Sequence, residues 1–124
     1  MANVSKNVLG NKGEDLACWY LQKKGYKIRQ RHYTCRFGEI DIVAEDRGVV
    51  VFVEVKTRTS EARGAPEQSV SQKKLANLRK AIFSYLSQNP INDYRIDVLA
   101  IIYKSASRQL VIRHHSAVSD IRRW

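Results

Sequence analysis

The stretch that decides the fold is Phe37–Arg58, which reads FGEIDIVAEDRGVVVFVEVKTR. Apolar residues alternate with polar ones from Glu39 to Ala44, and a Val-rich run extends from Val49 to Lys56. Both patterns are typical of β-strands, and the Asp46-Arg47-Gly48 segment between them is a turn signal. Two strands joined by so short a turn are expected to pair as an antiparallel hairpin.

This hairpin also carries the residues that indicate chemistry. Glu54 and Lys56 are two positions apart on a strand, so they share one face, opposite to the face of Val53 and Val55. If Asp41 pairs near Glu54, two carboxylates and an ammonium gather on that face. Neighbouring carboxylates repel each other unless a positive group lies between them, and Mg²⁺ (or Mn²⁺) prefers such oxygen ligands.

Such a metal polarises a phosphoryl oxygen and generates a hydroxide nucleophile, which predicts phosphodiester cleavage. Lys56 would orient the attacking water or stabilise negative charge in the transition state. The alternative is that Glu54 and Lys56 are ordinary solvent-facing residues of an amphipathic strand, and a Glu-x-Lys triplet alone does not decide between the two.

Working outward, the chain shows a helix and a strand before the hairpin strands, and further elements after them. Helical spacing of apolar residues predicts helices over Lys12–Lys24, ended by Gly25, and over Ser71–Gln88. Ser69 followed by Gln72 resembles a capping box. The further expected segments are strands Tyr26–Tyr33, Arg95–Tyr103 and Leu110–Arg113, a loop over Thr57–Val70, and a short helix in the tail to Trp124.

The resulting order, α-β-β-β-α-β-β, predicts an α/β fold with a mixed sheet flanked by helices. A chain of 124 residues is one domain's worth, so residues 11–124 are expected to form a single domain after a mobile N-terminus, 1–10.

The charge is strongly positive, with a formal net value of +10. A small domain this basic usually meets a polyanion, and nucleic acid is the first candidate. A membrane surface is less favoured, because neither helix combines a broad basic face with exposed Trp or Phe. A role in solubility alone stays open. The basic residues expected to contact phosphate are Arg36, Arg58, Lys73 and Lys74.

Two cysteines, Cys18 and Cys35, lack metal-binding spacing, and the first ten residues lack the apolar core of a signal peptide. We therefore expect a cytoplasmic protein with reduced thiols. Glu39 shares the face of Asp41 and is interpreted as structural rather than as a supporting carboxylate. Asp97 interrupts an apolar strand and is expected to pair with a buried base or cap a turn.

Five motifs occur in a fixed order along the chain: Gly13-Glu14, Gly25-Tyr26, Phe37–Asp41, Val51–Arg58 and Tyr94–Val98. Together they resemble the YraN-like family of small bacterial proteins, and Asp41 with Glu54-Val55-Lys56 resembles the PD-(D/E)XK nuclease signature. The resemblance implies a three-layer, restriction-endonuclease-like fold with a central five-stranded mixed sheet, similar to archaeal Holliday junction resolvases.

The resemblance also implies roles for individual residues. Asp41 and Glu54 match metal-binding carboxylates, Lys56 matches the catalytic lysine, and Glu14 matches an acidic residue that completes the metal site. Lys74 matches a basic position of the second helix. The chain departs from the family pattern at His32-Tyr33-Thr34, where Asn-Tyr-Arg is usual, so a threonine stands in place of that arginine and the next arginine is Arg36.

The function expected from residues and resemblance together is metal-dependent, structure-selective cleavage of DNA, including branched or junction DNA. The alternative is a non-catalytic nucleic-acid-binding module of the same fold. Junction resolvases act as dimers on a two-fold symmetric substrate, so a homodimer is expected by analogy.

Overall fold

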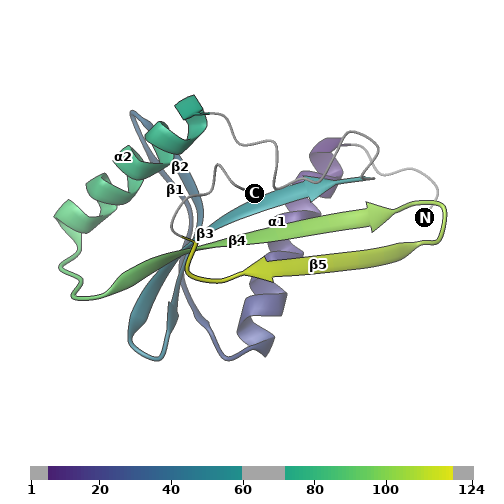
Figure 1. Cartoon of the computed structure of the whole chain (residues 1–124), viewed down its shortest axis with the longest axis horizontal. Coiled ribbons are helices and arrows are strands. Elements are labelled where there is room, and N and C mark those ends of the chain that lie inside the picture. The colour runs from purple at the N-terminus through teal and green to yellow at the C-terminus, as the bar shows by residue number, and fades with distance from the viewer. Residues whose placement is uncertain (1–5, 60–71, 119–124) are drawn as a thin grey trace.

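The structure, a computed structural model, describes residues 6–59 and 72–118 (Figure 1). The described part holds two helices and five strands. In chain order these are α1 (Lys6–Lys23), β1 (Lys27–Cys35), β2 (Gly38–Asp46), β3 (Val49–Arg58), α2 (Gln72–Gln88), β4 (Tyr94–Lys104) and β5 (Gln109–His115). This is the α-β-β-β-α-β-β order predicted from the sequence.

The strands form one mixed sheet in the order β1-β2-β3-β4-β5. β3 and β4 are parallel, and the other three neighbouring pairs are antiparallel. β2 and β3 form the predicted hairpin, whose two central turn residues, Arg47 and Gly48, both have positive φ angles of 51° and 86°. Positive φ at both positions matches the right-handed twist of paired strands. Figure 1 shows the twist of the whole sheet, with β1 and β2 crossing β3–β5 steeply.

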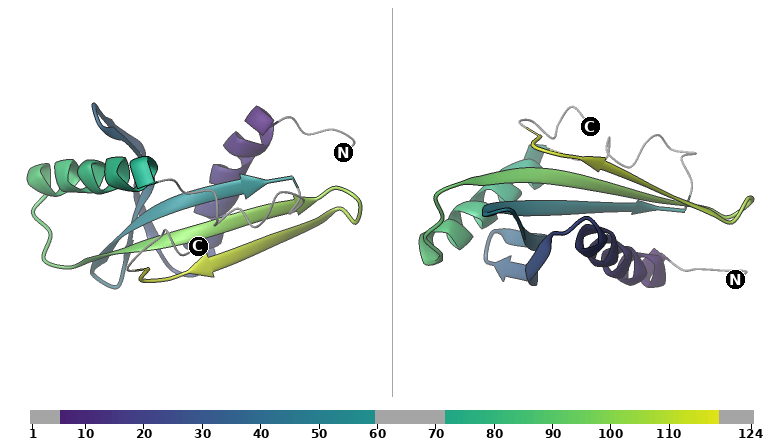
Figure 2. Two further views of the ribbon diagram at one scale, coloured as in Figure 1. Left: turned by 45° about the horizontal axis from the view of Figure 1, so that its top comes forward. Right: turned by 90° about the horizontal axis from the view of Figure 1, so that it is seen from below.

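Each face of the sheet packs against one helix, which makes three layers (Figure 2). On one face α1 buries Ala17 and Leu21 against Val51 and Val53 of β3. On the other face the apolar stripe of α2 covers Phe52 and its neighbours; the stripe contains Leu75, Leu78, Ala81, Ile82 and Tyr85. The alternation along β3 therefore divides its side chains between two cores. This arrangement confirms the predicted α/β fold with a five-stranded mixed sheet between helices.

The boundaries differ from the predicted ones at several ends. α1 begins at Lys6, so the part of the expected mobile N-terminus from Lys6 onward is helical. β3 continues to Arg58, two residues into the predicted loop, because it pairs with β4 as far as Arg58 and Ile102. The proposed cap at Ser69 and the tail helix near Trp124 lie outside the described residues.

The predicted end of the first helix is confirmed at Gly25. Its φ is 93°, and the Tyr26 amide donates a hydrogen bond of 2.9 Å to the Leu21 carbonyl. This is the left-handed glycine stop that satisfies the last carbonyls of a helix. No helix among the described residues is long and apolar enough to cross a bilayer.

A buried polar cluster joins β4 to β5, as expected for Asp97. The Asp97 carboxylate is fully buried and accepts hydrogen bonds from Arg95 Nε (3.1 Å) and the Ala117 amide (2.9 Å), while His114 Nε2 lies 2.8 Å from its second oxygen. Burial opposes ionisation, but these hydrogen bonds hold the pKa of Asp97 below its ordinary value. Asp97 is thus a structural acid.

Candidate active site

The site forms where the β2–β3 ladder ends. Backbone pairing runs from Asp46 and Val49 to Ile42 and Val53, and the next residues in register are Asp41 and Glu54. There the Val55 amide donates a hydrogen bond of 2.8 Å to Asp41 Oδ2, so a side chain replaces the backbone acceptor. This bond fixes the Asp41 carboxylate beside β3, at the position that the hairpin register predicts.

Glu54 and Lys56 lie on the α2 side of β3, as strand alternation predicts. Both are buried, each with a relative exposure of 4%, so they are not the solvent-facing pair of the alternative interpretation. Lys56 Nζ lies 3.0 Å from Glu54 Oε1, and Lys74 Nζ of α2 lies 3.0 Å from the same oxygen. A buried carboxylate needs such partners, because an unpaired charge is costly away from water.

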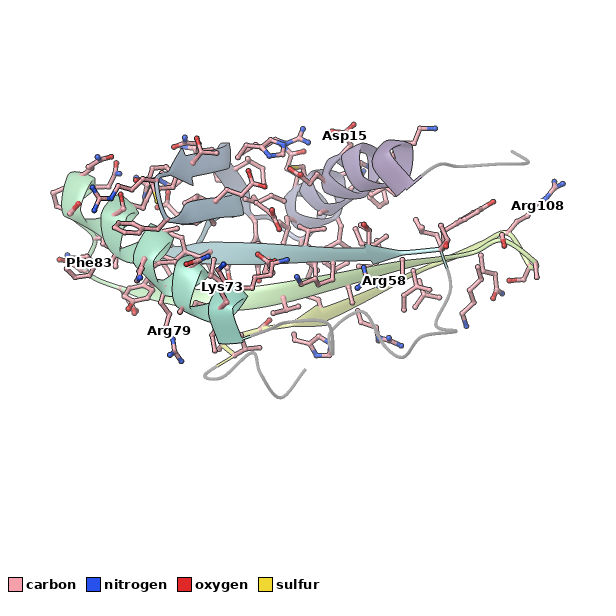
Figure 3. The ribbon with its side chains drawn as sticks, turned by 90° about the horizontal axis from the view of Figure 1, so that it is seen from above. Asp15, Arg58, Lys73, Arg79, Phe83 and Arg108 are labelled. Carbon is pink, nitrogen blue, oxygen red and sulfur yellow. The ribbon has the colours of Figure 1, made fainter. Side chains whose placement is uncertain are left out.

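A cleft of about 330 Å³ opens over these groups. It lies between the start of β2, the middle of β3 and the first turns of α2, and its lining residues are Gly38, Glu39, Asp41, Glu54, Lys73, Lys74, Asn77 and Leu78. Figure 3 shows Lys73 at the end of α2 that lies over the middle of the sheet, with Phe83 at the other end. The cleft thus has acidic groups at its base and lysines at its rim.

The electrostatics of the site follow from burial and crowding. Burial, and then the neighbouring Glu54 carboxylate, raise the pKa of Asp41 to about 8, although the Val55 hydrogen bond opposes this. Burial, and then the Lys74 ammonium, lower the pKa of Lys56, although Glu54 opposes this. Perturbed groups of both signs in one cleft are a feature of functional sites.

Glu14 of α1 lies next to this cluster but is engaged elsewhere. Its Oε1 atom lies within ion-pair distance of two basic groups, 2.8 Å from His32 Nε2 and 3.8 Å from Arg31 Nη2. The same oxygen is buried, and none of the described residues donates a hydrogen bond to it. Burial raises the pKa of Glu14, and the Glu14 charge in turn raises the pKa of Asp41. Across residues 6–59 and 72–118, no three His, Cys, Asp or Glu side chains form a ready-made metal cluster.

The residues predicted to contact phosphate are divided between two places. Lys73 and Lys74 line the cleft. Arg36 is exposed in the β1–β2 turn, with its guanidinium carbon 4.9 Å from the centre of the Phe37 ring. Arg58 is exposed at the end of β3 and donates to the Thr57 carbonyl at 2.9 Å (Figure 3). Glu39 lines the cleft but is half-exposed.

Some residues at or beside the cleft were not found by sequence reasoning. Asn77 lines the cleft, and its spacing of four residues from Lys73 places both on one face of α2, which was a usable signal. His32 beside Glu14 was not predicted, because that contact joins β1 to α1 and depends on how the two pack.

The fold and the site define a small basic α/β protein with paired carboxylates and lysines at the base of an open cleft. The chain belongs to the Uncharacterised protein family UPF0102, whose family model matches residues 13–101. UPF0102 is the YraN family, so this match confirms the family predicted from the sequence motifs.

Individual relatives agree over most of the chain. It is 41% identical over 119 residues to a UPF0102 protein of Carboxydothermus hydrogenoformans, covering 94% of this chain and 99% of that protein. UPF0102 proteins of Syntrophomonas wolfei subsp. wolfei and Geobacter metallireducens are 43% and 44% identical over 104 residues, which is 82% of this chain and 90% and 85% of theirs.

Proposed function

We propose that this protein is a metal-dependent nuclease that hydrolyses phosphodiester bonds in DNA. The observation that carries the proposal is the set of Asp41 and the buried pair Glu54 and Lys56 at the end of the β2–β3 ladder, under a cleft lined by lysines. The net charge of +10 supports a polyanionic substrate.

The donor set fits a hard divalent cation. Asp41 and Glu54 present oxygen ligands, and burial together with the Glu54 charge raises the pKa of Asp41. Glu14 is a third carboxylate near Asp41, and its Oε1 atom lacks a hydrogen bond from the described residues. Asp41 and Glu54 would hold Mg²⁺ (or Mn²⁺), with Glu14 as the supporting acid. The ion would polarise the scissile phosphate and lower the pKa of an attacking water.

Lysine side chains of the protein would position the water and bind the DNA. Lys56 is held in place by Glu54 and would orient the water or stabilise charge on the phosphate. Lys73 and Lys74 at the rim would bind the flanking phosphates without reading bases. The DNA would therefore be selected by shape rather than by sequence.

The test is cleavage of labelled DNA in Mg²⁺ or Mn²⁺, with duplex, single-stranded, flap and four-way-junction substrates. Asp41→Asn and Glu54→Gln preserve side-chain shape and are expected to lower the cleavage rate by at least about a hundredfold while DNA binding persists. Asp93→Asn removes an exposed acid outside the cleft and serves as the matched control. Cleavage that survives both site variants would overturn the proposal.

One observation favours a second function, a nucleic-acid-binding module that does not cleave. Glu54 Oε1 already has two ammonium partners at 3.0 Å, so its charge is compensated without a metal. This alternative predicts tight, salt-dependent binding of DNA with no product in either metal. A metal-dependent product that disappears in Asp41→Asn would exclude it.

A further inference from the structure

We propose that Phe37 is a stacking site for an unpaired nucleobase at the mouth of the cleft, so that the protein selects nucleic acid with single-stranded segments. The proposal rests on the nuclease function above and names its class of substrate. It starts from an apolar ring exposed on a strongly basic surface: Phe37 is 37% exposed in the two-residue turn between β1 and β2.

Two cations flank this ring. The Arg36 guanidinium carbon lies 4.9 Å from its centre, and Lys80 Nζ of α2 lies 5.3 Å from it. Contacts of this kind hold a ring in a preferred position by attraction to its electron-rich face. They also place two phosphate-binding groups, from two different elements, next to one aromatic surface.

The ring lies beside the cleft. Gly38, the next residue, lines the cleft together with Asn77, and a Cβ atom on Gly38 would lie 3.4 Å from the Asn77 Cβ. The turn and α2 therefore touch at this point. Lys73, Asn77 and Lys80 are spaced by four and three residues, so they form one ridge along α2 from the cleft to Phe37.

This combination matches the chemistry of single-stranded nucleic acid. An exposed aromatic ring binds any base by stacking, and flanking cations bind the backbone phosphates. In a continuous duplex the faces of the bases are stacked on each other and cannot reach the ring. A flap, a gap or a strand exchange point offers a free base face beside a phosphate.

Other exposed aromatic residues lack this placement. Phe83 is 75% exposed, but Figure 3 shows it at the end of α2 away from Lys73. Trp19 is 54% exposed with Lys23 Nζ 5.9 Å from its ring, but its helix α1 packs on the face of the sheet opposite to α2 and the cleft. Phe83 is therefore a matched control, since it is an exposed ring of the same type on a neighbouring surface.

The test is the binding of a single-stranded oligonucleotide that carries 2-aminopurine, in metal-free buffer so that the strand stays intact. Stacking on Phe37 is expected to quench the 2-aminopurine fluorescence. Phe37→Ala should weaken binding about tenfold and remove the quenching, whereas Phe37→Trp retains both and Phe83→Ala changes neither. Binding of Phe37→Ala within about twofold of the wild type, with quenching intact, would overturn the inference.

Two further measurements separate this inference from the nuclease proposal. Circular dichroism checks that Phe37→Ala keeps the wild-type fold, as expected for an exposed side chain. Asp41→Asn should lose cleavage while it keeps the quenching. Quenching that depends on Phe37 without cleavage by the wild type would overturn the nuclease proposal alone, and cleavage with quenching independent of Phe37 would overturn the stacking site alone.

Discussion

At the scale of single residues, Asp41 determines how the site responds to pH. Its pKa is raised from an ordinary value of 3.8 to about 8. Between these two pH values the carboxyl group is protonated in the folded protein but ionised in the unfolded chain. The free energy of unfolding therefore falls as pH rises from about 4 to about 8, and the loss is complete above the folded pKa.

Asp41→Asn removes this ionisation and keeps a side-chain oxygen for the Val55 amide. In metal-free buffer we expect the variant to have a higher Tm than the wild type at pH 9, by several degrees, since about 1 kcal/mol corresponds to about 4–8 °C in a small domain. The difference should shrink toward pH 4. Thermal melts of both proteins across this range measure it, and a difference independent of pH would contradict the assignment.

The same carboxylate predicts a response to metal. A divalent cation held by Asp41 and Glu54 binds only the folded state, so it stabilises the protein by about 2.7 kcal/mol at a hundredfold excess over Kd. We expect Mg²⁺ to raise the wild-type Tm at pH 8 and to leave the Tm of Asp41→Asn and Glu54→Gln nearly unchanged. Equal shifts in all three proteins would place the cation elsewhere.

At the scale of elements, the approach of α1 to β3 depends on one glycine. A Cβ atom at Gly13 would clash with Cγ2 of Thr57, the residue after Lys56. Without a side chain at position 13, the helix that carries Glu14 can pack directly on the strand that carries the lysine. A larger residue would have to push the two elements apart.

Gly13→Ala is therefore expected to destabilise the protein by about 1–3 kcal/mol, despite the better helix propensity of alanine. Thr57→Ser removes the clashing methyl group, so the double variant should recover most of the loss. Urea denaturation of the wild type, both single variants and the double variant gives the coupling energy directly. Additive effects would show that the contact does not limit the packing.

At the scale of the whole molecule, positive charge is spread over many elements, but only part of it faces the cleft. Lys73 lines the cleft, whereas Arg108 is exposed at the β4–β5 turn, far from Lys73 in Figure 3. The logarithm of the DNA-binding constant falls linearly with the logarithm of the salt concentration, and each lysine that contacts a phosphate steepens this slope by about 0.7–0.9.

Lys73→Ala should thus reduce the steepness of that slope by about one unit, while Arg108→Ala, which removes the same charge, leaves it nearly unchanged. Fluorescence anisotropy of labelled DNA from low to moderate salt provides the measurement. A matching decrease in both variants would indicate that binding depends on net charge alone and not on the cleft.

The sequence predicted the parts of this molecule that follow from local pattern. Alternation along β3 placed Glu54 and Lys56 on the face opposite to Val53 and Val55, and the short turn placed Asp41 beside β3, one residue beyond the last pair of the ladder. Features that depend on tertiary packing were not predictable in the same way. The Lys80 contact with Phe37 has no local signature, because it joins α2 to a distant turn. The spacing of Lys74 along α2 indicated that its side chain could reach toward the sheet, but not that it would pair with Glu54.

The hydrogen bond from the Val55 amide to Asp41 has a spectroscopic consequence. Most strand amides are bonded to carbonyls, whose acceptor strength does not vary with pH, but this amide is bonded to a group that titrates. Its ¹H resonance should move with an apparent midpoint near the pKa of about 8, and it should move again when a cation displaces the proton. A single backbone signal would then report the protonation and metal occupancy of the site without any substrate.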